Sequence, residues 1–248
     1  MAYAAVTRMR LPPAKEWPTI ALAGLCGVTI YHTALNYGEL TVPAGTASLI
    51  IATVPVFTSV LSRFTLGERL SAVAWGGFAL SLLGIVIMTL GGEREVGFTL
   101  GAIYVVISAL SGAVYFVLMK RVVGRYDPVD ATAAATWAGT LPLLVFSPGI
   151  VEAVREAPLH ATLAGVYIGV FPAGIAYAAW GIAMSRLPVS RVSAFLYLVP
   201  PLAILWGWVW AAEVPAPITF VGGLVALLGV IVVQRWGRPR PAPSPASG

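Results

Sequence analysis

Charged side chains are scarce in this sequence, since Asp, Glu, Lys and Arg together make up only 10% of its 248 residues. A soluble domain of this size carries about 25% charged residues to solvate its surface. Hydrophobic residues reach 58%, and the mean hydropathy is +0.88. No single soluble core could bury so much apolar side chain. The composition therefore predicts a membrane protein.

Residues that carry enzyme chemistry are also few. The single cysteine, Cys26, lies inside an apolar run, which excludes a disulfide framework and favours a packing role. The two histidines, His32 and His160, are far apart, and no carboxylate or thiol cluster has metal-ligand spacing. The absence of a G-x-x-x-x-G-K-[ST] loop excludes ATP hydrolysis as the energy source. We expect no enzyme activity, no cofactor and no metal.

Long apolar runs, by contrast, fill the chain, and a run of roughly 20 residues is needed to cross a bilayer core. Eight segments qualify: 17–38, 42–62, 71–90, 99–119, 131–148, 162–184, 190–211 and 217–234. The segment 131–148 is the weakest, because it is short and contains Pro142. The proline-rich tail 237–248 is expected to be disordered. The sequence thus predicts an all-α polytopic membrane protein with eight transmembrane helices.

Lysine and arginine are distributed unevenly between the two sides of these spans. Of the 15 basic residues, all except Arg94 and Arg155 fall on the same side. Positive charge is retained in the cytoplasm, so both termini are predicted to be cytoplasmic. The basic residues form no single patch, and nucleic acid is therefore not expected as a partner.

The chain also matches itself without gaps when residues 145 positions apart are compared. The markers pair Pro43 with Pro188, Ser48 with Ser193, Pro55 with Pro200, Glu68 with Glu213, Gly77 with Gly222, and Gly84 with Gly229. Span 17–38 would start in the cytoplasm and its counterpart 162–184 outside, so the two copies are inverted. Inverted repeats are the usual basis of secondary transporters, because they provide two nearly equivalent packings.

The repeat divides the chain unequally. Residues 1–92 form a first copy with three helices, and residues 97–236 form a second copy with five, followed by the tail 237–248. Subtracting the offset from 131–148 places Met1 to Tyr3 at the end of a span. We therefore expect the chain to lack the first helix and most of the second helix of the complete repeat pair.

Several motifs carry a resemblance to a known family. They are Ala34-Leu-Asn-Tyr37, Ala44-Gly-Thr-Ala-Ser-Leu49, Val54-Pro-Val-Phe57, Leu66-Gly-Glu-Arg-Leu-Ser71, Trp75-Gly-Gly77, Leu82-Leu-Gly-Ile85, Ala194-Phe-Leu-Tyr-Leu-Val-Pro-Pro201, Glu213 and Gly222-Gly-Leu-Val-Ala-Leu-Leu-Gly229. With these motifs the chain resembles the EamA-type branch of the drug/metabolite transporter superfamily, from Trp17 to Gln234. The resemblance implies ten helices in two inverted five-helix halves, eight of which would be in this chain.

The function expected from the repeat and the resemblance is secondary transport across a bacterial inner membrane by alternating access. Export of small organic metabolites, amino acids or drugs is the family-level expectation. A proton and a second copy of the chain are further candidate partners, beside the substrate and the bilayer. Two alternatives are a truncated or assembly-dependent fragment of such a carrier and an integral-membrane enzyme acting on lipid-linked substrates.

Candidate cavity residues are polar or aromatic side chains at mid-span. His32 forms a stripe with Thr29 and Asn36 at i, i+3 and i+7, and it could also relay protons. The other candidates are Tyr104, Ser108 and Tyr115 in the fourth span, Tyr177 and Trp180 in the sixth, and Ser193 and Tyr197 in the seventh. Tyr177 occupies the repeat position of His32. Helix packing would produce the same pattern of residues.

Two prolines and two glutamates complete the set of candidates. Pro55 and Pro200 are predicted hinges, since each lacks a backbone N–H and frees a carbonyl one turn earlier. A static bend is the alternative. Glu68 and Glu213 lie at span ends, where capping or interfacial pairing is expected.

Overall fold

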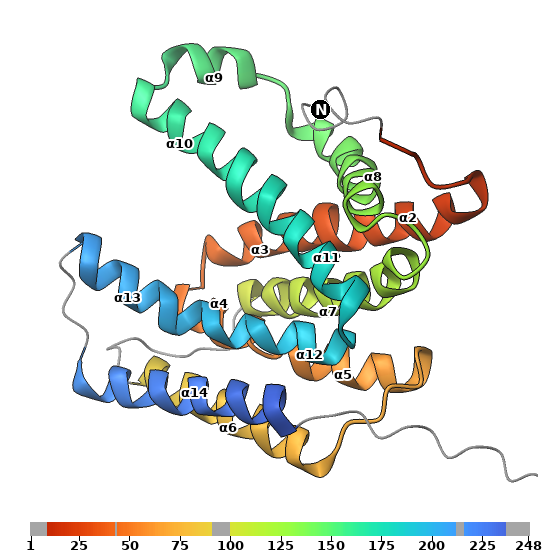
Figure 1. The fold of residues 1–248 in the computed structure, drawn as a ribbon. Helices are drawn as coiled ribbons and strands as arrows, with labels where there is room; N and C mark the ends of the chain where they lie inside the picture. Colours follow the sequence, from red (N-terminus) through yellow and green to blue (C-terminus); the bar gives the residue numbers. More distant parts are fainter. Residues whose placement is uncertain (1–8, 43, 91–99, 212–215, 237–248) are drawn as a thin grey trace, which may run out of the picture. The chain divides into compact units, whose positions relative to one another are not determined.

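Figure 1 shows a computed structural model of the chain, in which residues 9–42, 44–90, 100–211 and 216–236 are described. All regular secondary structure in these ranges is helical. The chain divides into two compact units, Met1–Thr29 with Leu118–Leu187 and Ile30–Val117 with Pro188–Gly248. The tail that was predicted to be disordered lies outside the described residues, as does Glu213.

Among the residues that the structure describes, six helical segments are long and apolar enough to cross a membrane. They are Ala14–Glu39, Ala47–Thr65, Leu100–Val123, Pro128–Phe146, Leu159–Arg186 and Pro217–Trp236. Shorter apolar helices, Ala72–Ile87 and Val189–Leu202, occupy the positions of the two remaining predicted spans. The all-helical prediction is confirmed, and the count of eight spans stays a prediction.

The first unit is built from helices of both halves of the sequence. Its elements are η1 (Ala14–Glu16), α2 (Trp17–Gly24), η2 (Leu25–Ile30) up to Thr29, the end of α7 (Leu100–Val123), α8 (Pro128–Thr140), η3 (Leu141–Phe146), α9 (Ile150–Glu156), α10 (Leu159–Val170), η4 (Phe171–Ala176) and α11 (Tyr177–Arg186). The α-helical part of the fifth predicted span ends at Thr140, and a 3-10 turn follows that contains Pro142. Proline explains this ending, because it cannot donate the hydrogen bond that would extend the α-helix.

Small residues let α2 and α8 approach closely in this unit. A Cβ atom on Gly24 would collide with the backbone of Ala135 and of Gly139. Thr29 strengthens the contact, since its hydroxyl donates a hydrogen bond of 2.5 Å to the Gly139 carbonyl oxygen. Close backbone approach at glycine and alanine is the usual packing of helices in a bilayer.

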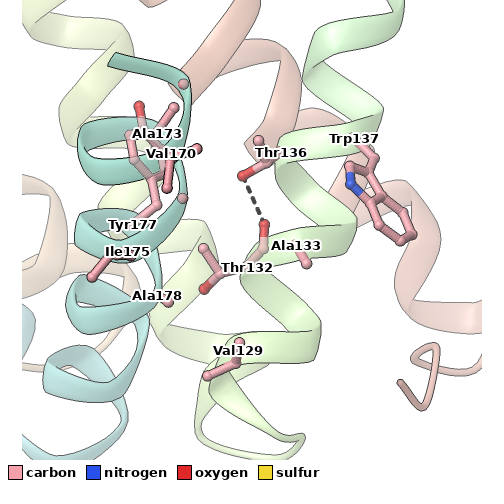
Figure 2. Close-up of a pocket in the computed structure, with 12 residues that line it drawn as sticks. Val129, Thr132, Ala133, Thr136, Trp137, Val170, Ala173, Ile175, Tyr177 and Ala178 are labelled. Carbon is pink, nitrogen blue, oxygen red and sulfur yellow. Dashed lines mark hydrogen bonds between the residues drawn. The ribbon is translucent and has the colours of Figure 1, made fainter. Parts of the chain in front are cut away.

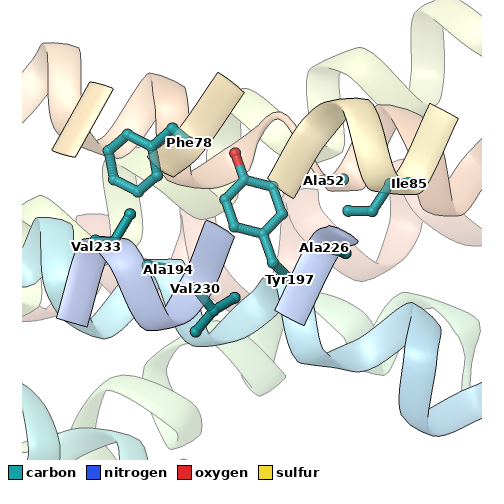
Figure 3. Close-up of a cluster of buried hydrophobic side chains, with 8 residues drawn as sticks. All are labelled: Ala52, Phe78, Ile85, Ala194, Tyr197, Ala226, Val230 and Val233. Atoms are coloured by element: carbon teal, nitrogen blue, oxygen red, sulfur yellow. The ribbon is translucent and has the colours of Figure 1, made fainter. Parts of the chain in front are cut away.

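The second unit contains the remaining helices. They are α3 (Tyr31–Glu39), α4 (Ala44–Ile51), α5 (Val54–Thr65), α6 (Ala72–Leu90), most of α7, α12 (Val189–Ser193), η5 (Ala194–Leu198), α13 (Val199–Ala211) and α14 (Pro217–Trp236). Its main core cluster gathers Phe78, Ile85, Tyr197, Val230 and Val233 with three alanines (Figure 3).

Helices α6 and α14 lie side by side in this unit and run antiparallel (Figure 1). A Cβ atom on Gly77 would lie 3.0 Å from the Gly229 carbonyl oxygen, and a Cβ atom on Gly84 would lie 2.6 Å from the Gly222 carbonyl oxygen. Neither contact leaves room for a side chain. Glycine at these positions therefore allows the two backbones to touch.

Two of the described segments are π-helical rather than α-helical. They are η2 (Leu25–Ile30) and η4 (Phe171–Ala176). Each lies within a long apolar helix, between α2 and α3 in one case and between α10 and α11 in the other. π-Helical turns are rare and occur frequently at functional sites.

Candidate functional site

A cavity of about 540 Å³ lies within the first unit, between α8 on one side and α10, η4 and α11 on the other (Figure 2). Its lining residues are Val129, Thr132, Ala133, Thr136, Trp137, Gly169, Val170, Ala173, Gly174, Ile175, Tyr177 and Ala178. The volume falls within the range of small-molecule sites, and the mostly apolar lining with a few polar groups is typical of them.

Helical spacing explains why these α8 residues share the cavity wall. Val129, Thr132, Ala133 and Thr136 follow the i, i+3, i+4, i+7 pattern of one helix face. The helix is fixed at its start by Asp127, whose side chain accepts hydrogen bonds of 3.0 Å from the Val129 and Asp130 N–H groups. An aspartate in this position is a favourable N-cap.

The opposite wall contains the π-helical segment η4. Three of its six residues, Ala173, Gly174 and Ile175, line the cavity, and Tyr177 follows directly after it. Pro172 stands at the start of η4 and has no N–H to donate, which favours a break in regular α-helical bonding. The small side chains of Ala173 and Gly174 leave space beside α8.

Tyr177 connects the π-helical segments η2 and η4. Its hydroxyl donates a hydrogen bond of 3.3 Å to the carbonyl oxygen of Gly27, which belongs to η2. Tyr177 is the one predicted cavity residue that lines the cavity, and it occupies the repeat position of His32. Trp180 lies one turn further along α11, is partly buried and is not among the lining residues.

The predicted stripe of Thr29, His32 and Asn36 is divided by the structure. Thr29 belongs to the first unit and packs α2 and η2 against α8. His32 belongs to the second unit, is partly buried and meets the Tyr31 ring edge-on, with 5.1 Å between ring centroids. Asn36 is exposed. Thr29 has the helix-packing contact that was considered as the alternative for this stripe.

The predicted residues of α7 have different surroundings. Ser108 is fully buried and donates a hydrogen bond of 3.0 Å to the Tyr31 carbonyl oxygen, so it joins α7 to α3. Tyr115 is buried, whereas Tyr104 is 38% exposed and lies near Tyr37. These three residues do not line the described cavity.

Ser193 and Tyr197 lie in the core of the second unit. The Ser193 hydroxyl donates a hydrogen bond of 3.1 Å to the Ser190 carbonyl oxygen. Tyr197 is fully buried beside Phe78, with 6.1 Å between the ring centroids (Figure 3), and its hydroxyl has no hydrogen-bond partner among the described residues. Burying such a hydroxyl is costly, which makes Tyr197 an unusual core residue.

Both predicted hinge prolines lie at helix junctions. Pro55 is in the first turn of α5, immediately after the break between α4 and α5 at Ala52 and Thr53. Pro200 is in the first turn of α13, directly after the 3-10 segment η5. The chain therefore departs from regular α-helix just before each proline, and hinge motion at these points stays a prediction.

Glu68 has the capping role that the sequence indicated. Its carboxylate accepts hydrogen bonds from the Val189 N–H at 2.9 Å, the Ser190 N–H at 3.3 Å and the Ser190 hydroxyl at 2.7 Å. These groups form the start of α12. A carboxylate at a helix N-terminus satisfies N–H groups that have no partner within the helix and interacts favourably with the helix dipole.

Several polar contacts of the first unit were missed by the sequence reasoning. The Lys120 ammonium donates hydrogen bonds to the carbonyl oxygens of Met184 and Leu187 at the end of α11. Asp130 is buried, and one of its carboxylate oxygens accepts a hydrogen bond of 2.9 Å from the Arg10 backbone N–H. Charge counting placed Lys120 at a cytoplasmic boundary but could not reveal these long-range partners.

A second polar group lies between α7 and α8. The Tyr126 hydroxyl donates a hydrogen bond of 3.2 Å to Glu16, which also pairs with Arg125 at 3.6 Å. Desolvation and the Glu16 carboxylate raise the pKa of the Tyr126 hydroxyl above its ordinary value. Tyr126 therefore remains a hydrogen-bond donor at neutral pH and ties this turn to η1.

Comparison with known proteins identifies the class of protein that this fold belongs to. A solved crystal structure, described only as that of a protein, superposes with a TM-score of 0.76 at 24% identity, over 94% of this chain and 82% of the other. This likeness concerns the fold alone. The EamA-like transporter family matches residues 1–90 and 99–235.

Sequence relatives agree with the family match. A protein of Streptantibioticus cattleyicolor named "Probable terminal-alkyne amino-acid exporter" is 39% identical over 96% of this chain and 80% of its own length. The uncharacterized transporter YdfC of Bacillus subtilis is 36% identical over 93% of this chain and 75% of its own. The inner membrane transporter YedA of Escherichia coli is 28% identical over 94% of this chain and 76% of its own length.

The molecule is thus a multi-pass helical membrane protein of the transporter class. The chain belongs to the EamA-like transporter family. The resemblance inferred from the motifs is confirmed. The absence of two helices, the division into two repeat copies and the cavity residues stay predictions.

Proposed function

We propose that this protein is a secondary transporter that moves small organic metabolites, amino acids or drugs by alternating access, with export as its direction. It would act in a bacterial inner membrane with both termini in the cytoplasm, as the distribution of basic residues predicts. The single observation that carries the proposal is the reciprocal packing of α6 and α14 in the second unit.

The reciprocity lies in which glycines meet. Gly77 approaches Gly229, and Gly84 approaches Gly222. Gly222 and Gly229 are the residues that the offset of 145 assigns to Gly77 and Gly84. Each residue thus contacts the counterpart of the other, which is the pattern of an interface around a two-fold axis. This pattern supports two inverted halves, and we propose that they form a ten-helix arrangement of which eight transmembrane helices lie in this chain.

Matching departures from α-helix give a second line of support. Adding 145 to the range of η2 gives 170–175, and η4 covers Phe171–Ala176. Equivalent spans therefore carry a π-helical segment at the same place, within one residue. Discontinuous helices at the midplane of each repeat are the usual site of substrate binding in such carriers.

The cavity beside η4 is the substrate site that we propose, with Tyr177 as the predicted residue that reaches it. His32, Thr29, Asn36, Tyr104, Ser108, Tyr115, Trp180, Ser193 and Tyr197 remain candidates for the larger translocation path. Pro55 and Pro200 are the proposed hinges. A proton as coupling ion, with His32 as its relay, and a homodimer are proposed with them.

Counterflow in proteoliposomes tests the proposal. Vesicles would be loaded with an unlabelled amino acid and diluted into the same labelled compound, using leucine, phenylalanine and 2-aminopent-4-ynoic acid. The last compound carries a terminal alkyne, the group named for the Streptantibioticus relative. Transient accumulation above equilibrium is expected for at least one substrate. Absence of counterflow across this panel and a wider set of metabolites would refute the carrier function.

A further inference from the structure

The hydroxyl groups of the cavity have their hydrogen atoms directed to backbone carbonyls. Thr132 donates to the Pro128 carbonyl oxygen at 2.7 Å, and Thr136 donates to the Thr132 carbonyl oxygen at 2.9 Å (Figure 2). Tyr177 donates to the Gly27 carbonyl oxygen at 3.3 Å. A hydroxyl has one hydrogen and two lone pairs, so a ligand in the cavity meets these three oxygens as acceptors.

Donor groups and cations are scarce in the lining. None of the lining side chains carries a formal charge, and the indole of Trp137 is the one side-chain N–H among them. Figure 2 places that indole on the side of α8 away from η4 and α11. A carboxylate ligand, which needs donors, would therefore face lone pairs at the hydroxyl groups.

A buried carboxylate lies on the helix that forms one wall of the cavity. Asp130 is the only charged side chain of α8, is 7% exposed, and follows Val129 of the cavity wall. One of its carboxylate oxygens has no hydrogen-bond partner among the described residues. A buried carboxylate creates a negative potential in its neighbourhood, and the Tyr177 ring adds a π-face that attracts cations.

We propose that this cavity binds a primary ammonium group attached to a short apolar tail and rejects a carboxylate in the same place. The ammonium offers three N–H donors, which match an acceptor lining, while Val129, Val170 and Ile175 accommodate the tail. This proposal rests on the proposed function, because it assigns the ammonium end of the transported molecule to the same cavity.

Equilibrium binding to the full chain in detergent tests this specificity without a transport assay. Three probes share one phenyl tail: phenethylamine, 2-phenylethanol and 3-phenylpropanoate. We expect phenethylamine to bind at least about tenfold more tightly than the alcohol, and the carboxylate to bind most weakly, because only the amine supplies charged donors. Equal affinity for the three probes, tighter binding of the carboxylate, or no binding of phenethylamine would overturn the proposal.

Two substitutions locate the binding. Thr136→Val and Tyr177→Phe each remove one acceptor oxygen with little change in shape, and each should weaken phenethylamine binding about tenfold, equivalent to about 1.4 kcal/mol. Thr140→Val is the matched control. Thr140 lies on the same helix and donates in the same way to the Thr136 carbonyl oxygen at 2.7 Å, but it is exposed and outside the lining.

The outcomes separate this proposal from the transport function. Thr136→Val with unchanged amine affinity would overturn the ammonium site, whatever the counterflow result. If metabolites of the wider set that lack an amine show counterflow as fast as the amino acids, the carrier function stays intact and the specificity is refuted. Selective amine binding without counterflow of any compound would refute transport alone. The three-probe comparison on the unaltered chain decides the specificity even if a variant fails to fold.

Discussion

The Ser81 hydroxyl donates a hydrogen bond of 3.0 Å to the carbonyl oxygen of Ala226, and these two residues are 145 positions apart. They are therefore equivalent residues of the proposed repeat, in direct contact with each other. In a two-fold arrangement, residues that lie on the axis meet their own counterparts. Gly77 and Gly84 lie on either side of Ser81, and each approaches the counterpart of the other, as the proposed inverted repeat requires.

The close approach of α6 and α14 predicts a large effect from one added methyl group. Gly84→Ala would place a Cβ atom 2.6 Å from the Gly222 carbonyl oxygen and against the backbone of Ala226. Backbone atoms cannot move aside as a flexible side chain can, so we expect a loss of about 1–3 kcal/mol. The measurement is the temperature at which half of the detergent-solubilised protein remains monodisperse.

Gly76→Ala is the control for that experiment. Gly76 is on the same helix, and apart from its chain neighbours and the nearby backbone of that helix, no atom of the described residues lies within 4 Å of the position its Cβ would take. Alanine has the higher helix propensity, so this variant should be as stable as the original chain or more stable by about 0.5–1 kcal/mol. Equal melting temperatures for Gly84→Ala and Gly76→Ala would contradict the packing of α6 on α14.

Much of the fold could be predicted because lipid imposes simple requirements. Apolar length indicated the helices, and Pro142 indicated where the fifth span would depart from α-helix. The count of eight spans stays a prediction, because Ala72–Ile87 and Val189–Leu202 are short apolar helices. Within Val189–Leu202 the 3-10 segment η5 interrupts the α-helix, and hydropathy alone does not predict such an interruption.

The site was harder to predict, for a geometric reason. The prediction that Thr29, His32 and Asn36 share one helix face assumed 3.6 residues per turn. The segment Leu25–Ile30 is π-helical, however, so its side chains are spaced differently around the helix axis. Thr132 and Thr136 were overlooked, because threonine in an apolar helix gives no signal of function. Their place beside η4 depends on contacts between segments that are distant in the sequence.

Glu68 should matter for stability through the helix it caps. Glu68→Ala removes the acceptor for the Val189 and Ser190 N–H groups and for the Ser190 hydroxyl. The expected loss is about 1–3 kcal/mol, because hydrogen bonds to a charged group are lost and donors are left without a partner. Unfolding in denaturant would measure it. Glu152→Ala, at an exposed position on α9, should change stability little, and a similar loss there would refute the capping role.

Lys120 provides the corresponding test in the first unit. Lys120→Met keeps the length of the side chain but removes the ammonium that binds the Met184 and Leu187 carbonyl oxygens at the end of α11. We expect a loss of about 1–3 kcal/mol, since two C-terminal carbonyls lose a charged donor. Thermal unfolding followed by circular dichroism would detect it. Arg155→Met on α9 is the charge-matched control, and a Lys120 variant no less stable than this control would contradict the contact.

His32 offers the sharpest test of proton coupling, because no Asp or Glu was found at mid-span in the sequence. If His32 relays protons, His32→Ala should slow counterflow and remove its dependence on pH, because an imidazole can both bind and release a proton. His160→Ala is the control, since that residue is exposed at the start of α10. A His32→Ala protein with the original rate and the original pH profile would exclude His32 from both the cavity and the proton path. A slower rate with the original pH profile would keep His32 in the substrate path and assign proton transfer to another group.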